Sequence, residues 1–438
     1  MLTTTEKRSL SRLSTVDTAK VVAKVLLPIL ARGAVIRRPR AVALAQRLDL
    51  DRRAVRLLTR LRERYGDAPL RLRLPGRDLV LPLDSSDAHE ALARSPEPFS
   101  PASLEKRHAL GQFQPEGLLI SPAEQRAHRR EFTEDVLATP YPVHPQAADF
   151  TAIVAQTVKP LLSQPELDWP AFTRQWWRLV RQVVLGTAAA GDDLITDRLF
   201  ALRRAGNWGW LHPRETKHRE MFLRHLRGAI DRAQPGSLAA RIAENHPGPD
   251  IHPESQVAHW LFAFDAAGVA VFRTLALLAT HPEQETKALA ESAGSAPDSF
   301  WELPYLRGCV QESLRLWPTT PLILRESTVD TTLGGHEIGK GATVILFAPY
   351  LHRNPAGFTP EIWQDGTAHF HGALVPFSDG PAVCPGRNLV LLLTTQVLAT
   401  LRREHKIGLL TRARLRPGRR LPSVLDHFAL RFALTRRD

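Results

Sequence analysis

The chain has 438 residues, of which 43% are hydrophobic and 24% are charged, and it contains only two cysteines. This composition excludes a disordered protein and a disulfide-stapled small domain, and it favours a reducing compartment. The net charge of +13 comes from scattered basic residues without zinc-finger spacing or an RNA-binding aromatic signature, so we expect a solvated arginine-rich surface and no nucleic-acid partner.

The first apolar run covers residues 20–31. It is too short to span a bilayer, it is interrupted by Lys24 and Pro28, and it lacks a signal-peptide cleavage pattern. We expect a packing helix here, with a peripheral membrane contact as the less favoured alternative. The protein is therefore expected to be cytoplasmic, without a transmembrane segment.

Helical and strand patterns follow in a clear order. Residues 38–65 read as helix, and residues 70–83 alternate apolar and polar side chains about a Pro-Gly turn, which predicts a β-hairpin. Further helices are expected at Pro122–Leu137, Pro145–Leu162, Trp169–Leu185, Asp193–Arg204, Arg214–Arg232, Gln256–Thr280, Pro304–Leu316 and Arg387–Glu404. Strands are expected within residues 325–347 and, as strand, loop and strand, within residues 415–434.

This order predicts a mainly α fold with a smaller β region near the two ends of the chain, rather than an alternating βαβ fold. No internal repeat and no linker stand out. We expect a single domain over residues 1–438, in which residues 1–64 form an N-terminal helical extension and residues 65–438 carry the motifs.

The most informative segment is FSDGPAVCPG, residues 377–386. Glycine and proline around Cys384 make a loop that is stiff and also permits close approach of a flat object. Backbone N–H groups at such a loop-to-helix junction stabilise a thiolate, which serves as a nucleophile, a redox sensor or a metal ligand. A nucleophile needs a nearby histidine base, which the sequence alone cannot place. A structural zinc site needs three more ligands, for which Cys309 is the only other thiol and His369 and His371 are less favoured candidates. A haem iron with one axial thiolate is the remaining option.

The loop resembles the haem-binding loop of cytochromes P-450, in which Phe377, Gly380, Cys384 and Gly386 have the family's spacing. The resemblance covers about residues 65–435. It implies the cytochrome P-450 fold, with haem b held between the long helix I and the Cys loop with its following helix. It also implies that Cys384 is the axial ligand and that Phe377 packs near its sulfur.

Three other segments match the family in the same order. Glu312 and Arg315 have the Glu-x-x-Arg spacing, which places both on one helix face as a structural ion pair. By resemblance, Arg325 on the following strand reaches a haem propionate. The segment 118–132 resembles helix C, where Gln125 stands at a position that is often His and Arg129 at the position of a propionate-binding Arg. Residues 352–363 resemble the segment that precedes the Cys loop.

The departures from the family carry functional information. Counting back from His281-Pro282, the acid–alcohol pair of helix I falls on Asp265 and Ala266, so the acid is present and the alcohol is absent. A substrate hydroxyl or carboxylate replaces the alcohol, or the enzyme uses peroxide, or it runs a rearrangement, dehydration or coupling. A fourth alternative is that Asp265 and water suffice.

Two further departures affect haem seating and stability. Ala382 stands where the family usually has a cation against a propionate. Ile362 stands where an Arg normally joins Glu312 and Arg315, so a third partner is absent or comes from elsewhere. The resemblance also suggests substrate-pocket residues, namely Phe262, Phe264, Thr320, Leu322 and His427.

The function expected from the sequence is a haem–thiolate oxidoreductase, a monooxygenase that acts on a small, natural-product-like substrate of secondary metabolism. An electron-donor protein such as an acidic ferredoxin is the expected partner, and the chain is expected to be a monomer. The alternatives are a peroxide-dependent, rearranging or coupling haem–thiolate enzyme, and a non-catalytic haem-binding scaffold.

Overall fold

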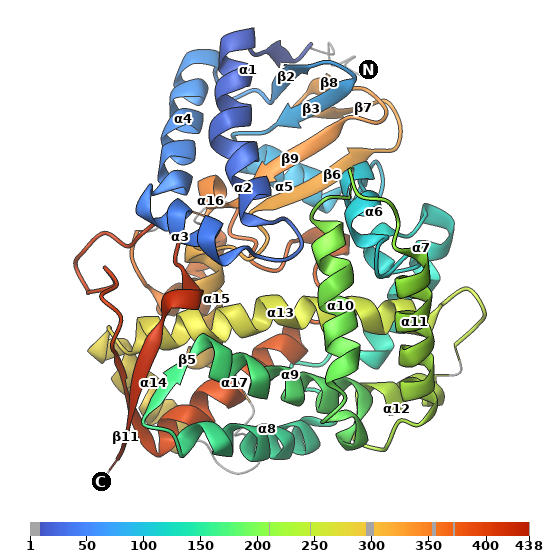
Figure 1. Ribbon diagram of the computed structural model, residues 1–438. Helices are drawn as coiled ribbons and strands as arrows, with labels where there is room; N and C mark the ends of the chain where they lie inside the picture. The colour runs from blue at the N-terminus through green and yellow to red at the C-terminus, as the bar shows by residue number, and fades with distance from the viewer. Residues whose placement is uncertain are drawn as a thin grey trace.

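The computed structural model describes residues 9–209, 211–245, 247–294, 302–352, 356–370 and 373–437. A large helical body carries a smaller sheet region at one end (Figure 1), which confirms the expected mainly α class. The helices are α1 (Thr15–Val21), a π-helical turn (Val22–Leu26), α2 (Leu27–Arg32), α3 (Pro39–Arg47), α4 (Leu50–Tyr65), α5 (Ser85–Ala93), α6 (Leu104–Leu110), α7 (Ala123–Val136), α8 (Ala147–Leu162), α9 (Trp169–Leu185), α10 (Asp193–Gly206), α11 (Thr216–Asp231), α12 (Leu238–Glu244), α13 (Pro253–Leu278), α14 (Pro282–Gly294), α15 (Pro304–Leu316), α16 (Ala348–Leu351) and α17 (Arg387–Arg403).

The strands form three sheets. A six-stranded sheet has the order β1 (Ser11–Arg12), β2 (Leu70–Leu74), β3 (Arg77–Leu81), β9 (Thr343–Phe347), β6 (Leu322–Ser327) and β4 (Phe99–Ser100). A three-stranded sheet contains β10 (His405–Leu409), β11 (Arg431–Arg436) and β5 (Glu166–Asp168), and β7 (Thr331–Leu333) pairs with β8 (His336–Ile338).

Alternating side chains explain how the large sheet is covered on both faces. Leu70, Leu72 and Ile345 point to one face, where they pack against Val21 and Leu58 from the N-terminal helices. Val80, Val344 and Leu346 point to the opposite face, against α5. The predicted packing helix at residues 20–31 is thus confirmed, because Val21, Val25 and Ile29 bury one face of it in this cluster.

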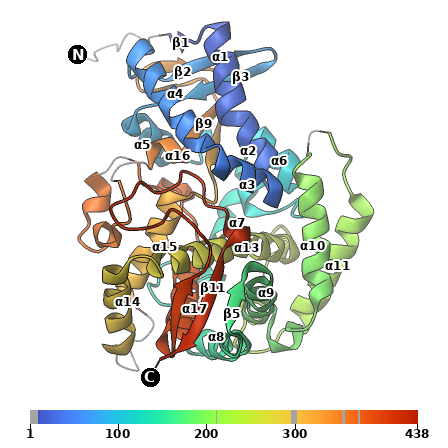
Figure 2. The same cartoon turned by 60° about the vertical axis from the view of Figure 1, so that its left-hand side comes forward.

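Helix α13 forms the axis of the helical body (Figures 1 and 2), and it packs against α9, α11, α15 and α17. It is the one described helix that is long and apolar enough to cross a membrane, yet 78% of its apolar window is buried inside the protein. The indole of Trp176 donates to the carbonyl of Phe264 at 2.9 Å. A Cβ at Gly268 would lie 2.8 Å from that indole nitrogen, so glycine is required where α9 presses on α13.

Most predicted elements are present, with local differences. The hairpin of β2 and β3 is confirmed. The helix predicted over residues 38–65 is divided, because Asp49 adopts a φ of 50° between α3 and α4. The strand predicted near Leu415 is wrong: the C-terminal hairpin pairs β10 with β11, and residues 415–426 contain no strand.

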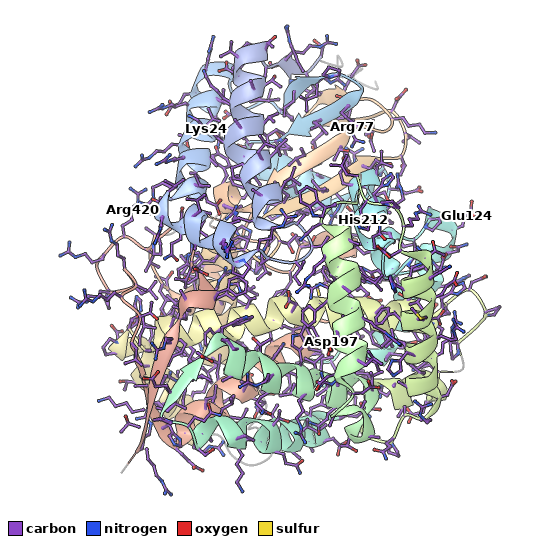
Figure 3. The ribbon with its side chains drawn as sticks, viewed as in Figure 1. Lys24, Arg77, Glu124, Asp197, His212 and Arg420 are labelled. Carbon is purple, nitrogen blue, oxygen red and sulfur yellow. The ribbon has the colours of Figure 1, made fainter. Side chains whose placement is uncertain are left out.

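The outer surface carries charged side chains of both signs. Figure 3 shows Lys24, Glu124, Asp197 and Arg420 at the periphery, and all four are exposed. This distribution agrees with the expected solvated surface.

Candidate functional site

The Cys loop is held in one shape by its backbone. The Cys384 N–H donates to the Phe377 carbonyl at 2.9 Å, and α17 begins three residues after the cysteine. Gly380 has a φ of +66°, and a Cβ there would lie 2.3 Å from the Leu92 carbonyl oxygen of α5. Only glycine allows this left-handed turn and this close approach. The loop is therefore fixed against α5 on one side and against α17 on the other.

The sulfur of Cys384 sits among groups that act on its charge. Burial raises the pKa of the thiol, while the Gly386 N–H that donates to the sulfur, together with Arg130 and Arg387, opposes this rise. Removal of the thiol proton in this apolar setting requires a compensating cation. An iron ion supplies such a charge, whereas the arginines act only from the side.

The remaining thiol and the other metal-binding side chains form no competing site. Cys309 is buried on α15, and burial raises its pKa well above the ordinary range. Among the described residues, no group of three His, Cys, Asp or Glu side chains is arranged to hold a metal ion. A metal at Cys384 must therefore bring most of its ligands with it.

Three cations gather beside the Cys loop, of which Arg325 and Arg126 are buried and Lys106 is half-buried. Arg325 on β6 donates to Ser95 Oγ at 2.8 Å and to Ser378 Oγ of the Cys loop at 3.0 Å. Lys106 on α6 donates to backbone carbonyls, one of them that of Leu324 at 3.0 Å. Arg126 on α7 donates to the Leu118 carbonyl at 2.9 Å.

Nothing in the described structure neutralises these three cations. Burial and the charge of Arg126 lower the pKa of Arg325 to about 10, and burial, Arg325 and Arg126 lower the pKa of Lys106. Among the residues described, no carboxylate forms an ion pair with Lys106, Arg126 or Arg325. Buried charges without partners are costly, so the cluster fits a ligand with more than one carboxylate. The two propionates of haem meet this requirement.

The cation predicted on helix C lies elsewhere. Arg129 is buried on α7, where it pairs with Glu116 at 2.8 Å and also binds Ser121 and the Asp250 carbonyl. Its contact with a propionate therefore stays a prediction. Gln125 is half-buried on the same helix. Sequence reasoning missed Arg126 and Lys106, which supply the charge that Ala382 lacks.

One face of α13 is accessible inside an otherwise buried helix. His259, Phe262, Ala263 and Ala266 are partly exposed, and they are spaced i, i+3, i+4 and i+7, which places them in one stripe. Thr320, after α15, is also exposed, as expected of a residue that meets substrate.

Two predicted pocket residues lie in the core instead. Phe264 is on the other side of α13, packed against Trp176. His427 is buried against Trp169, with ring centroids 4.5 Å apart. Leu322 is half-buried and packs against the N-terminal cluster.

Asp265 is engaged in an ion pair. Its Oδ2 lies 2.6 Å from Nη2 of Arg203 on α10, and the same nitrogen donates to the Val35 carbonyl at 3.0 Å. The Arg203 side chain is 1% exposed and that of Asp265 is 22% exposed. The carboxylate is thus fixed next to Ala266, whose methyl group offers no hydrogen bond.

The Glu312–Arg315 pair is fully buried and completely supported. Arg315 Nη2 donates to Glu312 at 2.9 Å and to the Gly357 carbonyl at 2.7 Å. Glu312 also accepts from the Thr359 backbone at 2.8 Å and from the Trp363 indole at 3.0 Å. The missing third charge at Ile362 is therefore replaced by neutral donors.

Comparison with known proteins gives a consistent picture. A family model for cytochrome P-450 matches residues 263–412, which include most of α13 and the Cys loop. The chain is 35% identical over 202 residues to cyclooctat-9-en-7-ol 5-monooxygenase of Streptomyces melanosporofaciens, covering 42% of this chain and 44% of that protein. It is 41% identical over 109 residues to ferruginol synthase of Salvia fruticosa, covering 23% and 22%.

The matched region spans less than half the length of these relatives. Solved structures extend the likeness of fold over most of the chain. A cyanobacterial protein bound to retinoic acid superimposes with a TM-score of 0.67 at 20% identity, covering 86% of this chain and 94% of that one. A zebrafish protein with abiraterone gives a TM-score of 0.68 at 17% identity, covering 87% and 98%.

Proposed function

The chain belongs to the cytochrome P-450 family, and on this premise we propose that it is a haem–thiolate monooxygenase of a small organic substrate, with haem b ligated by Cys384. The observation that carries the proposal is the joining of two sites. Ser378 ties the cysteine loop to Arg325, so the thiolate and the unneutralised cation cluster meet in one place. Few ligands other than an iron porphyrin satisfy both.

Each residue has a separate task in this proposal. When bound, haem supplies an iron at which the thiolate favours O–O bond cleavage. Lys106, Arg126 and Arg325 bind the two carboxylates, and the Gly386 N–H stabilises the sulfur. The accessible stripe on α13 contacts the substrate.

Proton handling differs from the usual arrangement. Asp265 holds the only carboxylate of the acid–alcohol pair, and Arg203 keeps that carboxylate in place. The methyl group of Ala266 leaves room for a water or a substrate hydroxyl to donate in its stead. We propose that Asp265 passes protons to this group.

The Asp265–Arg203 pair and the missing hydroxyl also favour a second candidate. An enzyme that uses peroxide, or that rearranges or couples its substrate, needs less proton delivery. Product formation with peroxide, and none with dioxygen, reductant and a redox partner, would replace the monooxygenase proposal with this one.

The proposed partner for dioxygen chemistry is an acidic electron-donor protein of the ferredoxin class. The net charge of +13 supports an acidic partner. A bifunctional cytochrome P-450/NADPH–P-450 reductase of Bacillus subtilis is 32% identical over 155 residues, covering 32% of this chain and 15% of that protein, and it carries its own reductase. We further propose a cytoplasmic monomer.

The first test is the carbon-monoxide difference spectrum of the reduced protein. We expect the red-shifted band of a thiolate-ligated haem, its loss in Cys384→Ala, and its retention in the matched control Cys309→Ala. A red-shifted band that persists in Cys384→Ala would refute the ligand assignment.

A second test separates the cation cluster from Arg129. Arg126→Gln is expected to weaken haem retention by at least about tenfold, because it removes a charge-assisted hydrogen bond of about 1.5–3 kcal/mol. Arg129→Gln is the matched control on the same helix. Haem transfer to apomyoglobin measures both, and equal losses would contradict the assignment of Arg126.

A further inference from the structure

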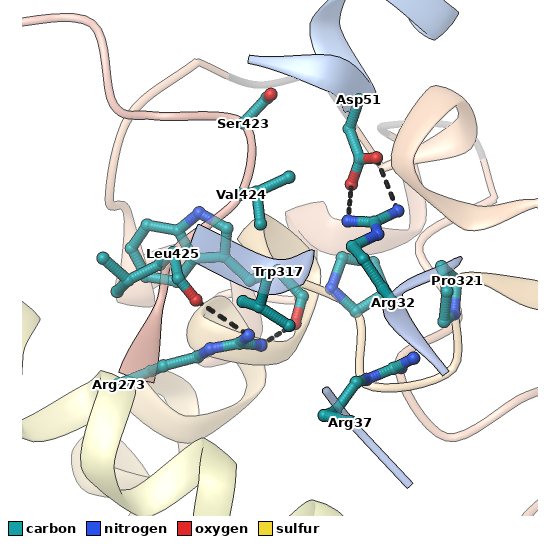
Figure 4. A pocket seen from close by; sticks show the side chains of 11 residues that line it. Arg32, Arg37, Asp51, Arg273, Trp317, Pro321, Ser423, Val424 and Leu425 are labelled. Carbon is teal, nitrogen blue, oxygen red and sulfur yellow. Dashed lines mark hydrogen bonds and ion pairs between the residues drawn. The ribbon is translucent and has the colours of Figure 1, made fainter. Parts of the chain in front are cut away.

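A small pocket lies between the N-terminal helices and the helical body (Figure 4). Its cavity volume is about 30 Å³, which is room for one or two water molecules or for a carboxylate group. It is lined by Arg32, Arg37, Val42, Asp51, Arg273, Trp317, Pro318, Pro321, Ser423, Val424 and Leu425. Segments far apart in the sequence thus contribute side chains to it, and three of these side chains are arginines.

Only one of the three arginines has a carboxylate partner in the described structure. Arg32 binds Asp51 through two bonds of 2.7 and 3.1 Å, and this ion pair forms one wall. Arg37 donates to the Thr319 carbonyl at 2.5 Å, and Arg273 forms no ion pair with any residue that the structure describes. The pocket therefore has two positive charges that are not balanced by an ion pair.

Arg273 is as deeply buried as Arg32, since both are 7% exposed. Its two terminal nitrogens donate to the carbonyls of Trp317 and Leu425 at 3.0 Å each, and Nε has no hydrogen-bond partner among the described residues. Burial, followed by the charges of Arg37 and Arg32, lowers the pKa of Arg273 to about 9. Carbonyl dipoles orient a guanidinium, but they do not neutralise it.

Other carboxylates close to the arginines are engaged or disfavoured as ions. Asp265 acts on Arg37 through space but is bound by Arg203. Burial raises the pKa of Asp426, although Arg273 opposes this, and its Oδ1 accepts from the Phe428 N–H. Arg37 and Arg273 therefore have no ion-pair partner among the described residues, and an anion from outside the protein would supply one.

The pocket lies on the same side of α13 as the reaction site. Arg273 follows Ala266 by seven residues, which is two helical turns, so both project from one face about 10 Å apart. Trp317–Pro321, another wall of the pocket, includes the exposed Thr320. Val269 and Ala270, which lie between them on this face, are buried, so the link to the reaction site runs through Arg37, on which Asp265, the neighbour of Ala266, acts through space.

We propose that this pocket binds the anionic end of the substrate, a carboxylate or a phosphate monoester, while the rest of the substrate extends past Arg37 toward Asp265 and Ala266. This inference rests on the proposed function, and it names the substrate class. Forked guanidinium groups are suited to both anions. The N-terminal segment that contains Arg32 and Arg37 thereby becomes part of substrate recognition.

An anion held in the pocket fixes one end of the substrate, so oxidation is directed to a position at a set distance from the anionic end.

The test is calorimetric binding of four probes to the haem-loaded protein: decanoate, decyl phosphate, decanamide and inorganic phosphate. We expect decanoate or decyl phosphate to bind at least about tenfold more tightly than decanamide. Arg37→Gln should abolish this preference. Arg38→Gln is the matched control, because Arg38 is the next residue and does not line the pocket.

Three outcomes would overturn the inference: equal affinity for decanoate, decyl phosphate and decanamide; an equal loss in Arg37→Gln and Arg38→Gln; or inorganic phosphate binding as tightly as decyl phosphate. The last outcome means a free anion rather than a substrate. If Arg37→Gln does not fold, Arg37→Lys keeps the charge without the fork and should weaken the preference several-fold.

The carbon-monoxide spectrum of the same preparation separates this inference from the proposed function. A thiolate band together with no preference for anions defeats the inference alone. The absence of a thiolate band would refute the proposed function. Binding of decanoate could still be measured by calorimetry in that case, because it requires no turnover.

Discussion

Ala266 presents a methyl group at the position where a hydroxyl would donate to the reacting centre. One such donor is worth about 10²–10³ in rate. We expect Ala266→Thr to raise the product formed per electron consumed several-fold, with the same product. Assays of product and of released peroxide per reductant measure this. Ala266→Val has the bulk of threonine without the hydroxyl, and the same gain in that variant would show that bulk alone acts.

Asp265 and Arg203 form a pair in which one partner is nearly inaccessible. Asp265→Asn leaves the guanidinium of Arg203 without a counter-charge. We expect a loss of up to about 3 kcal/mol in the free energy of unfolding, at the lower end of the range for buried pairs, because Asp265 is 22% exposed. Adding Arg203→Met to Asp265→Asn should recover most of this loss. Urea unfolding measures both variants, and additive losses would contradict a direct coupling.

Trp363 supports the buried Glu312 through its indole N–H. Trp363→Phe removes this donor, and we expect a loss of about 1–3 kcal/mol in stability, because a buried charged acceptor loses a partner. Trp208→Phe is the control, since that indole is exposed. Thermal unfolding of the haem-loaded protein compares them. A similar loss at both positions would leave the role of Trp363 unsupported.

At the scale of single residues, the sequence predicts types of contact better than partners. The spacing of Glu312 and Arg315 placed them together, and the structure agrees. The family resemblance selected Arg129, which pairs with Glu116, and not Arg126, which joins the cation cluster. A helix pattern does not tell which of two arginines three residues apart has a carboxylate nearby. Lys106 lies in the short polar helix α6, whose sequence pattern does not show which of its charged side chains belongs to a site.

Helix α5, which contacts the Cys loop, carries a carboxylate that makes the stability of the protein depend on pH. Burial, followed by Asp84 and Glu90, raises the pKa of Asp87 on this helix to about 6. Since the folded pKa lies above that of a free Asp, the folded state holds the proton longer, and stability falls as pH rises from about 4 to about 6.

We therefore expect Asp87→Asn to stabilise the protein by about 1–2 kcal/mol at pH 7.5, and by about a third of that at pH 4.5. Thermal unfolding at the two pH values measures the difference. Asp197→Asn, at an exposed position on α10, should show no such dependence. A gain that is independent of pH would contradict the argument.

At the scale of elements, periodicity was informative where one face is buried. Alternation in β2 and β3 predicted the hairpin and its inward face. The all-apolar character of α13 hid its orientation, so Phe264 was assigned to the pocket although Trp176 buries it. Backbone strain at Asp49, which divides α3 from α4, leaves no mark in hydrophobic pattern.

At the scale of the whole molecule, a charge of +13 attracts an acidic donor over a long range. We expect the rate of reduction by an acidic ferredoxin to fall about tenfold between about 50 and 300 mM salt, because salt screens this attraction. Reduction by dithionite, a small reagent, is the control. A rate that does not change with salt would argue against electrostatic docking.

The order of the motifs, through the family resemblance, predicted the overall fold. It did not predict how the strands of the large sheet pair with one another. Nothing in the composition of β3 shows that it pairs with β9, because pairing of distant parallel strands depends on how the intervening helices bring them together.

That pairing determines when the edge of β3 is covered during synthesis of the chain. Leu79 and Val80 of β3 face Thr343 and Val344 of β9, so the edge of the N-terminal hairpin has no strand partner until 262 further residues (343 minus 81) have been translated. At about 5–20 residues per second, the ribosome needs roughly a quarter of a minute to a minute. Throughout this interval the nascent chain displays an apolar strand edge, which makes it a natural client for chaperones that wait at the exit tunnel.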